Sequence, residues 1–113
     1  MEELEQVPVV RSDEIFKLVS DIELEEYTPF TFNDSEYQLI WFPKEDLDKD
    51  GEAWFSSSTQ IDGFDIYILE DLTDKEKRRR IFHEILEADL AKKGFSKAHE
   101  VALAEEEKLY SSP

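Results

Sequence analysis

The chain has 113 residues and contains no cysteine, only three glycines, one methionine and two histidines. Without cysteine, neither disulfide bonds nor thiolate metal sites can form. No apolar run approaches the ~18 residues of a membrane-spanning helix. The start MEELEQVPVV also lacks the apolar stretch of a signal peptide. We therefore expect a cytoplasmic protein with no membrane partner.

Basic residues are also scarce. Thirteen lysines and arginines stand against 29 aspartates and glutamates, which gives a formal net charge of −16. A field of this sign repels the phosphates of nucleic acids, so we expect no nucleic-acid partner. The same field favours a basic protein or peptide as partner, and solubility alone is the other explanation of the charge.

The length predicts a single domain over residues 1–113, with a small core that buries about 65% of the unfolded surface. We expect residues 1–11 to form a flexible arm, because Pro8 blocks an early helix. The next segment predicts an N-terminal helix that ends before Pro29. Its apolar residues recur at helical spacing, at Ile15, Leu18, Val19 and Ile22.

The middle of the chain is rich in aromatic and β-branched residues in short runs, which is typical of strands. These runs predict strands at residues 36–42, 53–58 and 64–70. Short turns separate neighbouring runs, so we expect a small antiparallel sheet of three or four strands.

The last third of the chain changes to helical periodicity. Thr73 and Glu76 form a capping-box pattern, and the apolar residues that follow predict a helix over 74–93. Gly94 is a suitable stop, and a second helix is expected over 97–110. The order of elements predicts an α+β domain. It has an N-terminal helix, an antiparallel sheet, and a C-terminal helical pair packed on one face of that sheet.

An acidic segment, DLDKDGEAWFSS, resembles part of an EF-hand calcium loop. Asp46, Asp48, Asp50 and Gly51 fall at its positions one, three, five and six. Position twelve should be a bidentate glutamate but is Ser57, and both flanks have strand character rather than helical character. We therefore interpret the segment as an exposed hairpin loop without tightly bound calcium.

A basic run, KEKRRR, extends from Lys75 to Arg80. On a helix these side chains point around most of the circumference, and acidic residues lie close by in the sequence. We interpret the run as a solvated face with local ion pairs. A clamp for an anion or a carboxylate is the alternative.

Both histidines are followed directly by a glutamate, and the first belongs to a His-Glu-x-x-Glu sequence. His83 and Glu87 are four residues apart, so they share one face of the predicted helix. In helical zinc hydrolases such a pair holds the metal. The glutamate beside the first ligand, here Glu84, remains free to act as general base on water.

His99, on the second predicted helix, is the only other histidine. His83, Glu87 and His99 would form a His2Glu donor set, the ligand count of a catalytic zinc site with one open position. Three nearby carboxylates could replace or support these ligands, namely Glu100, Glu106 and Glu107.

With these features, residues 36–107 resemble the zincin metallopeptidases. In that family a strand precedes a His-Glu-x-x-His helix, and a downstream residue completes the metal site. The resemblance implies a zinc-dependent peptidase or amide hydrolase. It makes His83 the first ligand and Glu84 the general base. Glu87 stands in place of the second histidine, and His99 falls where the third ligand is expected.

A different interpretation needs no metal. His83 lies beside Phe82 and Leu86 and could be a half-buried helix residue bonded to a neighbour, and His99 could be an ordinary surface residue. The protein would then be a non-catalytic acidic binding module that docks on a basic partner. Such a module would be either an inactive zincin-like protein or a mimic of nucleic-acid charge.

Overall fold

The computed structural model describes residues 10–46 and 51–110 of the chain. In order, the elements are α1 (Ser12–Asp21), β1 (Phe30–Phe32), β2 (Ser35–Phe42), the 3-10 helix η1 (Lys44–Asp46), β3 (Ala53–Ser57), β4 (Gly63–Leu69), α2 (Asp74–Lys92) and α3 (Ala98–Tyr110). The predicted α+β class is confirmed. The three predicted strands and the two C-terminal helices begin and end within one residue of their expected bounds.

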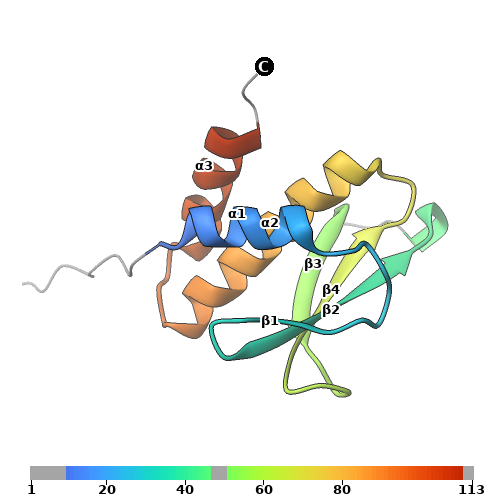
Figure 1. Cartoon of the computed structure of the whole chain (residues 1–113), viewed down its shortest axis with the longest axis horizontal. Coiled ribbons are helices and arrows are strands. Elements are labelled where there is room, and N and C mark those ends of the chain that lie inside the picture. Colours follow the sequence, from blue (N-terminus) through green and yellow to red (C-terminus); the bar gives the residue numbers. More distant parts are fainter. Residues whose placement is uncertain (1–9, 47–50, 111–113) are drawn as a thin grey trace, which may run out of the picture.

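The strands form one mixed sheet in the order β1-β2-β4-β3 (Figure 1). The pairs β1–β2 and β3–β4 are antiparallel, but β2 and β4 are parallel, with Leu39 opposite Ile66. The prediction of a purely antiparallel sheet is therefore wrong for the central pair. β3 follows β2 in the sequence but lies at the edge of the sheet, and its antiparallel partner β4 takes the central position beside β2.

The parallel pair begins with a close approach of two backbones. Gly63 is the first residue of β4 and lies opposite Glu36 of β2. A Cβ atom at Gly63 would lie 1.9 Å from the carbonyl oxygen of Glu36. Only a residue without a side chain fits this position.

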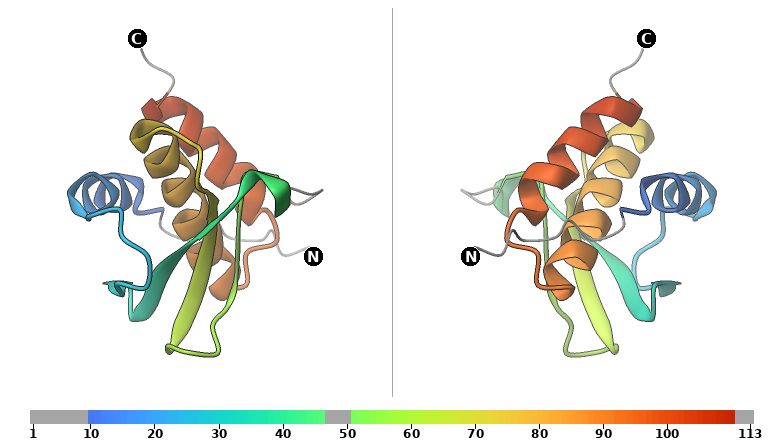
Figure 2. Two further views of the ribbon diagram at one scale, coloured as in Figure 1. Left: turned by 90° about the vertical axis from the view of Figure 1, so that its right-hand side faces the viewer. Right: turned by 90° about the vertical axis from the view of Figure 1, so that its left-hand side faces the viewer.

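The helices cover one face of the sheet, and α2 is the central element of the helical layer (Figures 1 and 2). It contacts α1, α3, β3 and β4. The core lies between these elements and includes Ile15, Val19, Tyr37, Leu39, Ile66, Ile68, Ile81, Phe82, Ile85, Leu86, Leu90 and Ala102. Burial of each large side chain contributes about 1.5–3 kcal/mol. Because α2 is covered on several sides, three of its polar residues are also buried, namely His83, Glu84 and Asp89.

Local signals set the ends of α2. Thr73 Oγ1 accepts a hydrogen bond from the backbone N–H of Glu76 at 3.2 Å, as the capping pattern predicts. At the other end, Gly94 has a φ of +81°, a left-handed conformation that glycine adopts without strain. After this turn α3 folds back beside α2 (Figure 2).

The N-terminal region is tied to the rest of the domain. Of the predicted arm, Val10 and Arg11 fall among the described residues, and Val10 packs against the core. Arg11 donates a 3.3 Å hydrogen bond to Asn33 in the turn between β1 and β2. At the start of α1, the Ser12 hydroxyl donates to Glu105 of α3 at 2.5 Å. The arm is therefore fixed at least from Val10 onward.

Residues 47–50 of the acidic segment, which include Asp48 and Asp50, lie outside the described residues. Its flanks are the strands β2 and β3, with η1 between them, rather than the two helices of an EF-hand. Because β4 lies between β2 and β3 in the sheet, the prediction that the segment joins the two strands of a hairpin is wrong. In the described part of the chain, no helix is both long and apolar enough to cross a membrane.

Candidate metal centre

The facing sides of α2 and α3 bring both histidines together. His83 and Glu87 are one turn apart on α2, and His99 lies in the first turn of α3. Glu106 follows His99 by seven residues, about two helical turns, and therefore shares its face of α3. The two helices thus bring these polar side chains together at their interface, and α2 also contacts the edge strand β3.

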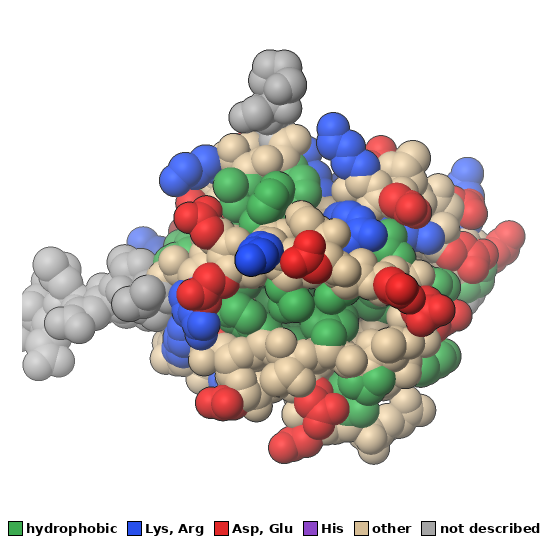
Figure 3. Space-filling view, viewed as in Figure 1, with side chains coloured by type: hydrophobic (Ala, Val, Ile, Leu, Met, Phe, Trp, Pro, Cys, Tyr) green, Lys and Arg blue, Asp and Glu red, His purple; other side chains and the backbone are tan. Residues whose placement is uncertain are grey.

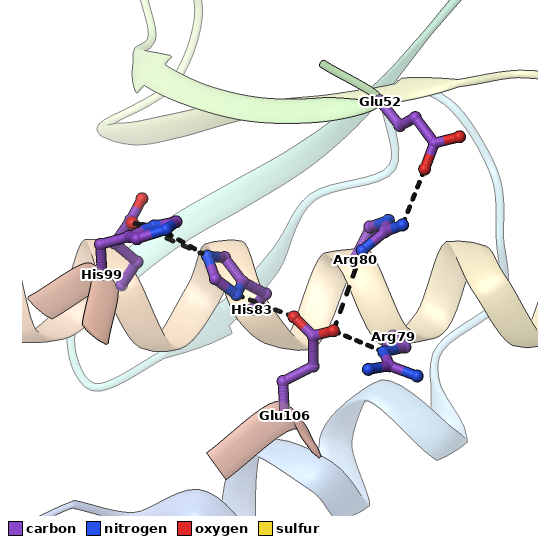
Figure 4. Close-up of polar contacts among 7 residues, drawn as sticks. Glu52, Arg79, Arg80, His83, His99 and Glu106 are labelled. Carbon is purple, nitrogen blue, oxygen red and sulfur yellow. Dashed lines mark hydrogen bonds and ion pairs between the residues drawn. The ribbon is translucent and has the colours of Figure 1, made fainter. Parts of the chain in front are cut away.

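The three predicted ligand residues converge. Nε2 of His83 is 3.3 Å from Nδ1 of His99 and 3.7 Å from Oε1 of Glu87. Nδ1 of His99 is 2.5 Å from the same oxygen of Glu87. Figure 4 shows the two imidazoles turned toward each other between the helices. Three donor atoms therefore lie around one point that a single ion could occupy.

These separations can be compared with those of a zinc site. Two ligand atoms, each about 2.0–2.1 Å from a tetrahedral zinc ion, lie about 3.3 Å apart. The distances of His83 Nε2 from the other two donor atoms are close to this value. His99 and Glu87 are closer because they are hydrogen-bonded, so a metal would have to separate them by about 1 Å. The His99 side chain is 69% exposed, which leaves it room to move.

The second ring nitrogen of His83 has its own partner. Nδ1 lies 2.8 Å from Oε1 of Glu106, whose side chain is only 2% exposed. The other oxygen of Glu106 accepts a hydrogen bond from Arg79, and Arg80 lies 3.8 Å from it. A carboxylate on the far nitrogen is a common support of metal-binding histidines. Figure 4 shows this chain of contacts running from His99 to Arg79.

The three arginines of the basic run each have a defined contact, so the run is not a uniformly solvated face. Arg78 donates to two backbone carbonyl oxygens at the C-terminal end of α1. Arg79 pairs with Glu106, and Arg80 pairs with Glu52, just before β3, at 2.7 Å. Sequence reasoning missed the role of Arg79. The available signal was its four-residue spacing from His83 on the same helix.

A cleft of about 370 Å³ opens beside the donor atoms, between the start of β3 and the facing sides of α2 and α3. His83, Glu84 and His99 line it, together with Leu103 of α3. Ligand pockets commonly have volumes of about 300–1,000 Å³. The cleft therefore gives a small ligand, or a short stretch of peptide, access to both histidines and to Glu84.

Glu84 is a buried carboxyl group at this cleft, with 6% exposure. Burial raises its pKa to about 7, the charge on His83 lowers it, and the charges of Glu87 and Glu106 raise it further. A group that titrates near neutral pH can both accept and donate a proton there. Glu84 thus has the chemistry expected of a general base in the cleft.

Contacts within the cluster shift the pKa values of His83 and Glu87 in opposite directions. Burial lowers the pKa of His83, but its contact with Glu87 and the charges of Glu84 and Glu106 outweigh burial, and the pKa is raised. The pKa of Glu87 is lowered by its contact with His83; burial opposes this shift and the contact with His99 strengthens it. A proton on His83 Nε2 therefore competes with any metal for the same lone pair.

No family model matches the chain, and neither a curated protein nor a solved structure is similar to it.

Proposed function

We propose that the protein is a zincin-like, zinc-dependent peptidase or amide hydrolase. His83, Glu87 and His99 hold the metal, and Glu84 is the general base. The observation that supports this proposal most directly is the convergence of Nε2 of His83, Nδ1 of His99 and Oε1 of Glu87 around one point. Two imidazoles and a carboxylate form a donor set that zinc accepts, with one position left open for catalysis.

The cleft supports a hydrolytic role for the site. Zinc would act there as a Lewis acid that polarises a carbonyl group and activates water. Glu84 shares the cleft with His83 and His99. A positive charge in the site favours the ionised form of Glu84, which can then remove a proton from the attacking water and pass it to the leaving amine.

Metal content and thermal stability test this proposal. The protein purified without chelator should contain about one zinc ion per chain, and added zinc should raise the melting temperature of chelator-treated protein by mass action. His83→Ala should abolish this rise. Magnesium should produce none, because it prefers ligand sets made only of oxygen. Glu84→Gln should retain the zinc response and lose hydrolysis of a generic peptide or amide substrate, since Glu84 is not a ligand.

Binding to a basic partner without catalysis is the second candidate, motivated by the net charge of −16. On the face of the molecule shown in Figure 3, acidic and basic side chains are interspersed. That face therefore presents no single acidic surface for a basic partner. If zinc changes neither the melting temperature nor the histidine resonances, the cluster is an imidazole–carboxylate network of structural importance. The acidic binding module would then be the better explanation.

A further inference from the structure

Glu106 is an unusual residue to find at the interface of α2 and α3. Its side chain is 2% exposed, and its two oxygens have different partners. Oε1 lies 2.8 Å from Nδ1 of His83, and Oε2 pairs with Arg79. Figure 4 shows Glu106 between the imidazole of His83 and the guanidinium groups of Arg79 and Arg80. A buried carboxylate is costly unless it is paired and hydrogen-bonded, and Arg79 supplies that pairing.

The donor and acceptor roles in this chain of contacts are fixed by chemistry. A guanidinium group only donates hydrogen bonds, and an ionised carboxylate only accepts them. Nδ1 of His83 must therefore carry the proton that Glu106 accepts. When the ring is neutral, the other nitrogen, Nε2, is left with a free lone pair. Nε2 is the atom that lies 3.3 Å from His99 and 3.7 Å from Glu87.

We propose that Glu106, held in place by Arg79, is a positioning residue for His83. It fixes the imidazole as the Nδ1–H tautomer and directs Nε2 toward His99 and Glu87, the other two proposed metal ligands. The inference rests on the proposed metal site, and it assigns a role to one arginine of the basic run. In this role Glu106 is not itself a metal ligand and acts through His83.

Replacement of Glu106 by glutamine gives a sharp test, because glutamine has the same shape but only one oxygen. The guanidinium of Arg79 only donates hydrogen bonds, so the oxygen of the new amide should face Arg79. The NH2 group then faces Nδ1 of His83, which must accept instead of donate. The proton of the neutral ring moves to Nε2, and a metal must then displace that proton to bind there. Glu106→Gln should therefore invert the tautomer of His83.

The tautomer can be read in metal-free protein from long-range 1H–15N correlation spectra of the histidine rings. The spectra should be recorded at pH about 9, well above the usual imidazole pKa of about 6.5. The unaltered protein should show the Nδ1–H form of His83, and Glu106→Gln should show the Nε2–H form. Glu107→Gln is the matched control, since Glu107 is the next residue of α3 and is exposed. It should leave the tautomer unchanged.

A double variant tests the part assigned to Arg79. In Arg79→Met/Glu106→Gln the guanidinium no longer attracts the amide oxygen, so the glutamine can turn and accept from Nδ1. The Nδ1–H form should then return, at least in part. A purely structural role of Glu106 does not predict this reversal, because the double variant removes more native contacts than the single one.

Zinc titration provides the second measurement. Affinity should fall by about 10–100-fold in Glu106→Gln and stay unchanged in Glu107→Gln. The inference is overturned if neutral His83 in the unaltered protein carries its proton on Nε2, a measurement that does not depend on any variant folding. Failure of the proposed function would appear differently, as an absence of zinc binding by the unaltered protein whatever the tautomer of His83.

Discussion

The side chains of His99 and Glu87 are joined by a 2.5 Å hydrogen bond that spans the interface of α2 and α3. The same two atoms, Nδ1 and Oε1, are proposed as metal ligands. In metal-free protein, this bond connects the two helices at the point where the ion would connect them. Metal binding would therefore exchange one link between the helices for a stronger one.

The stabilisation by zinc should increase with pH. The raised pKa of His83 means that a proton occupies its ring to a higher pH than usual. Zinc must displace that proton from Nε2, so its affinity falls by up to about tenfold for each pH unit below the pKa. The rise in melting temperature with zinc should be larger at pH about 8 than at pH about 6. Equal rises at both pH values, or a rise that persists in His83→Ala, would contradict the assignment of this ligand.

Metal-free protein should lose stability as the pH rises from about 5 to 8. The folded state keeps a proton on Glu84, whose pKa is about 7 against 4.5 in the unfolded chain, and the unfolded state releases that proton at lower pH. His83 acts in the same direction. Its raised pKa stabilises the folded state below the unfolded value, and this contribution disappears as the pH passes the folded value. Urea unfolding at several pH values measures how steeply the free energy of unfolding falls with pH.

Glu84→Gln should remove most of this pH dependence of the free energy of unfolding, because an amide does not titrate. The variant should be more stable than the unaltered metal-free protein at pH about 8, by up to about 3 kcal/mol. At pH about 5 the difference should be small, because Glu84 is then protonated and neutral in the folded state. Glu107→Gln serves as control and should leave this pH dependence as it is. An identical pH dependence in Glu84→Gln would show that Glu84 is ionised in the folded state.

Arg78 should matter for stability far more than Lys75, an exposed residue of the same basic run. It donates to two carbonyl oxygens at the C-terminal end of α1, where a positive charge also interacts favourably with the helix dipole. Arg78→Met should lower the free energy of unfolding by about 2 kcal/mol. Lys75→Met, at an exposed position of the same run, should change it by less than about 0.5 kcal/mol. Comparable losses would show that Arg78 acts only through general charge.

Two glycine substitutions should differ strongly in effect. Gly63→Ala places a Cβ atom against the backbone of Glu36, which cannot move without separating β2 from β4. We expect a loss of more than about 3 kcal/mol or failure to fold. Gly94→Ala meets no atom within 4 Å and only has to adopt a φ of +81°, at a cost of about 1–2 kcal/mol. Circular dichroism and urea unfolding separate the two outcomes.

The helices could be predicted from the sequence because their signals are local. Thr73, Glu76 and Gly94 define the ends of α2 within a few residues of each boundary, and its apolar residues recur at helical spacing. The order of strands has no such signal. The residues of β2, β3 and β4 do not indicate that β3 lies at the edge, since the strand order depends on contacts between strands that are distant in the sequence.

The grouping of His83, Glu87 and His99 was predictable for the same reason, but the contact of Glu106 with His83 was not. The spacing of His83, Glu84 and Glu87 follows from one helix, and the sequence contains only one other histidine. The sequence offered Glu106 as one of three carboxylates of similar standing. Only the packing of α3 on α2 shows that Glu106 is the one that reaches His83.

The turn at Gly94 has a further consequence, because every group of the proposed site and its supporting pair lies between Arg79 and Glu106, in a single helical hairpin. Contacts between segments so close along the chain require little loop-closure entropy and form at low contact order. The hairpin of α2 and α3 can thus be regarded as a structural unit that could be transferred to another protein. Grafted onto another scaffold that covers α2, it would carry the proposed metal ligands, the proposed general base and the buried carboxylate of Glu106 as one continuous stretch of sequence.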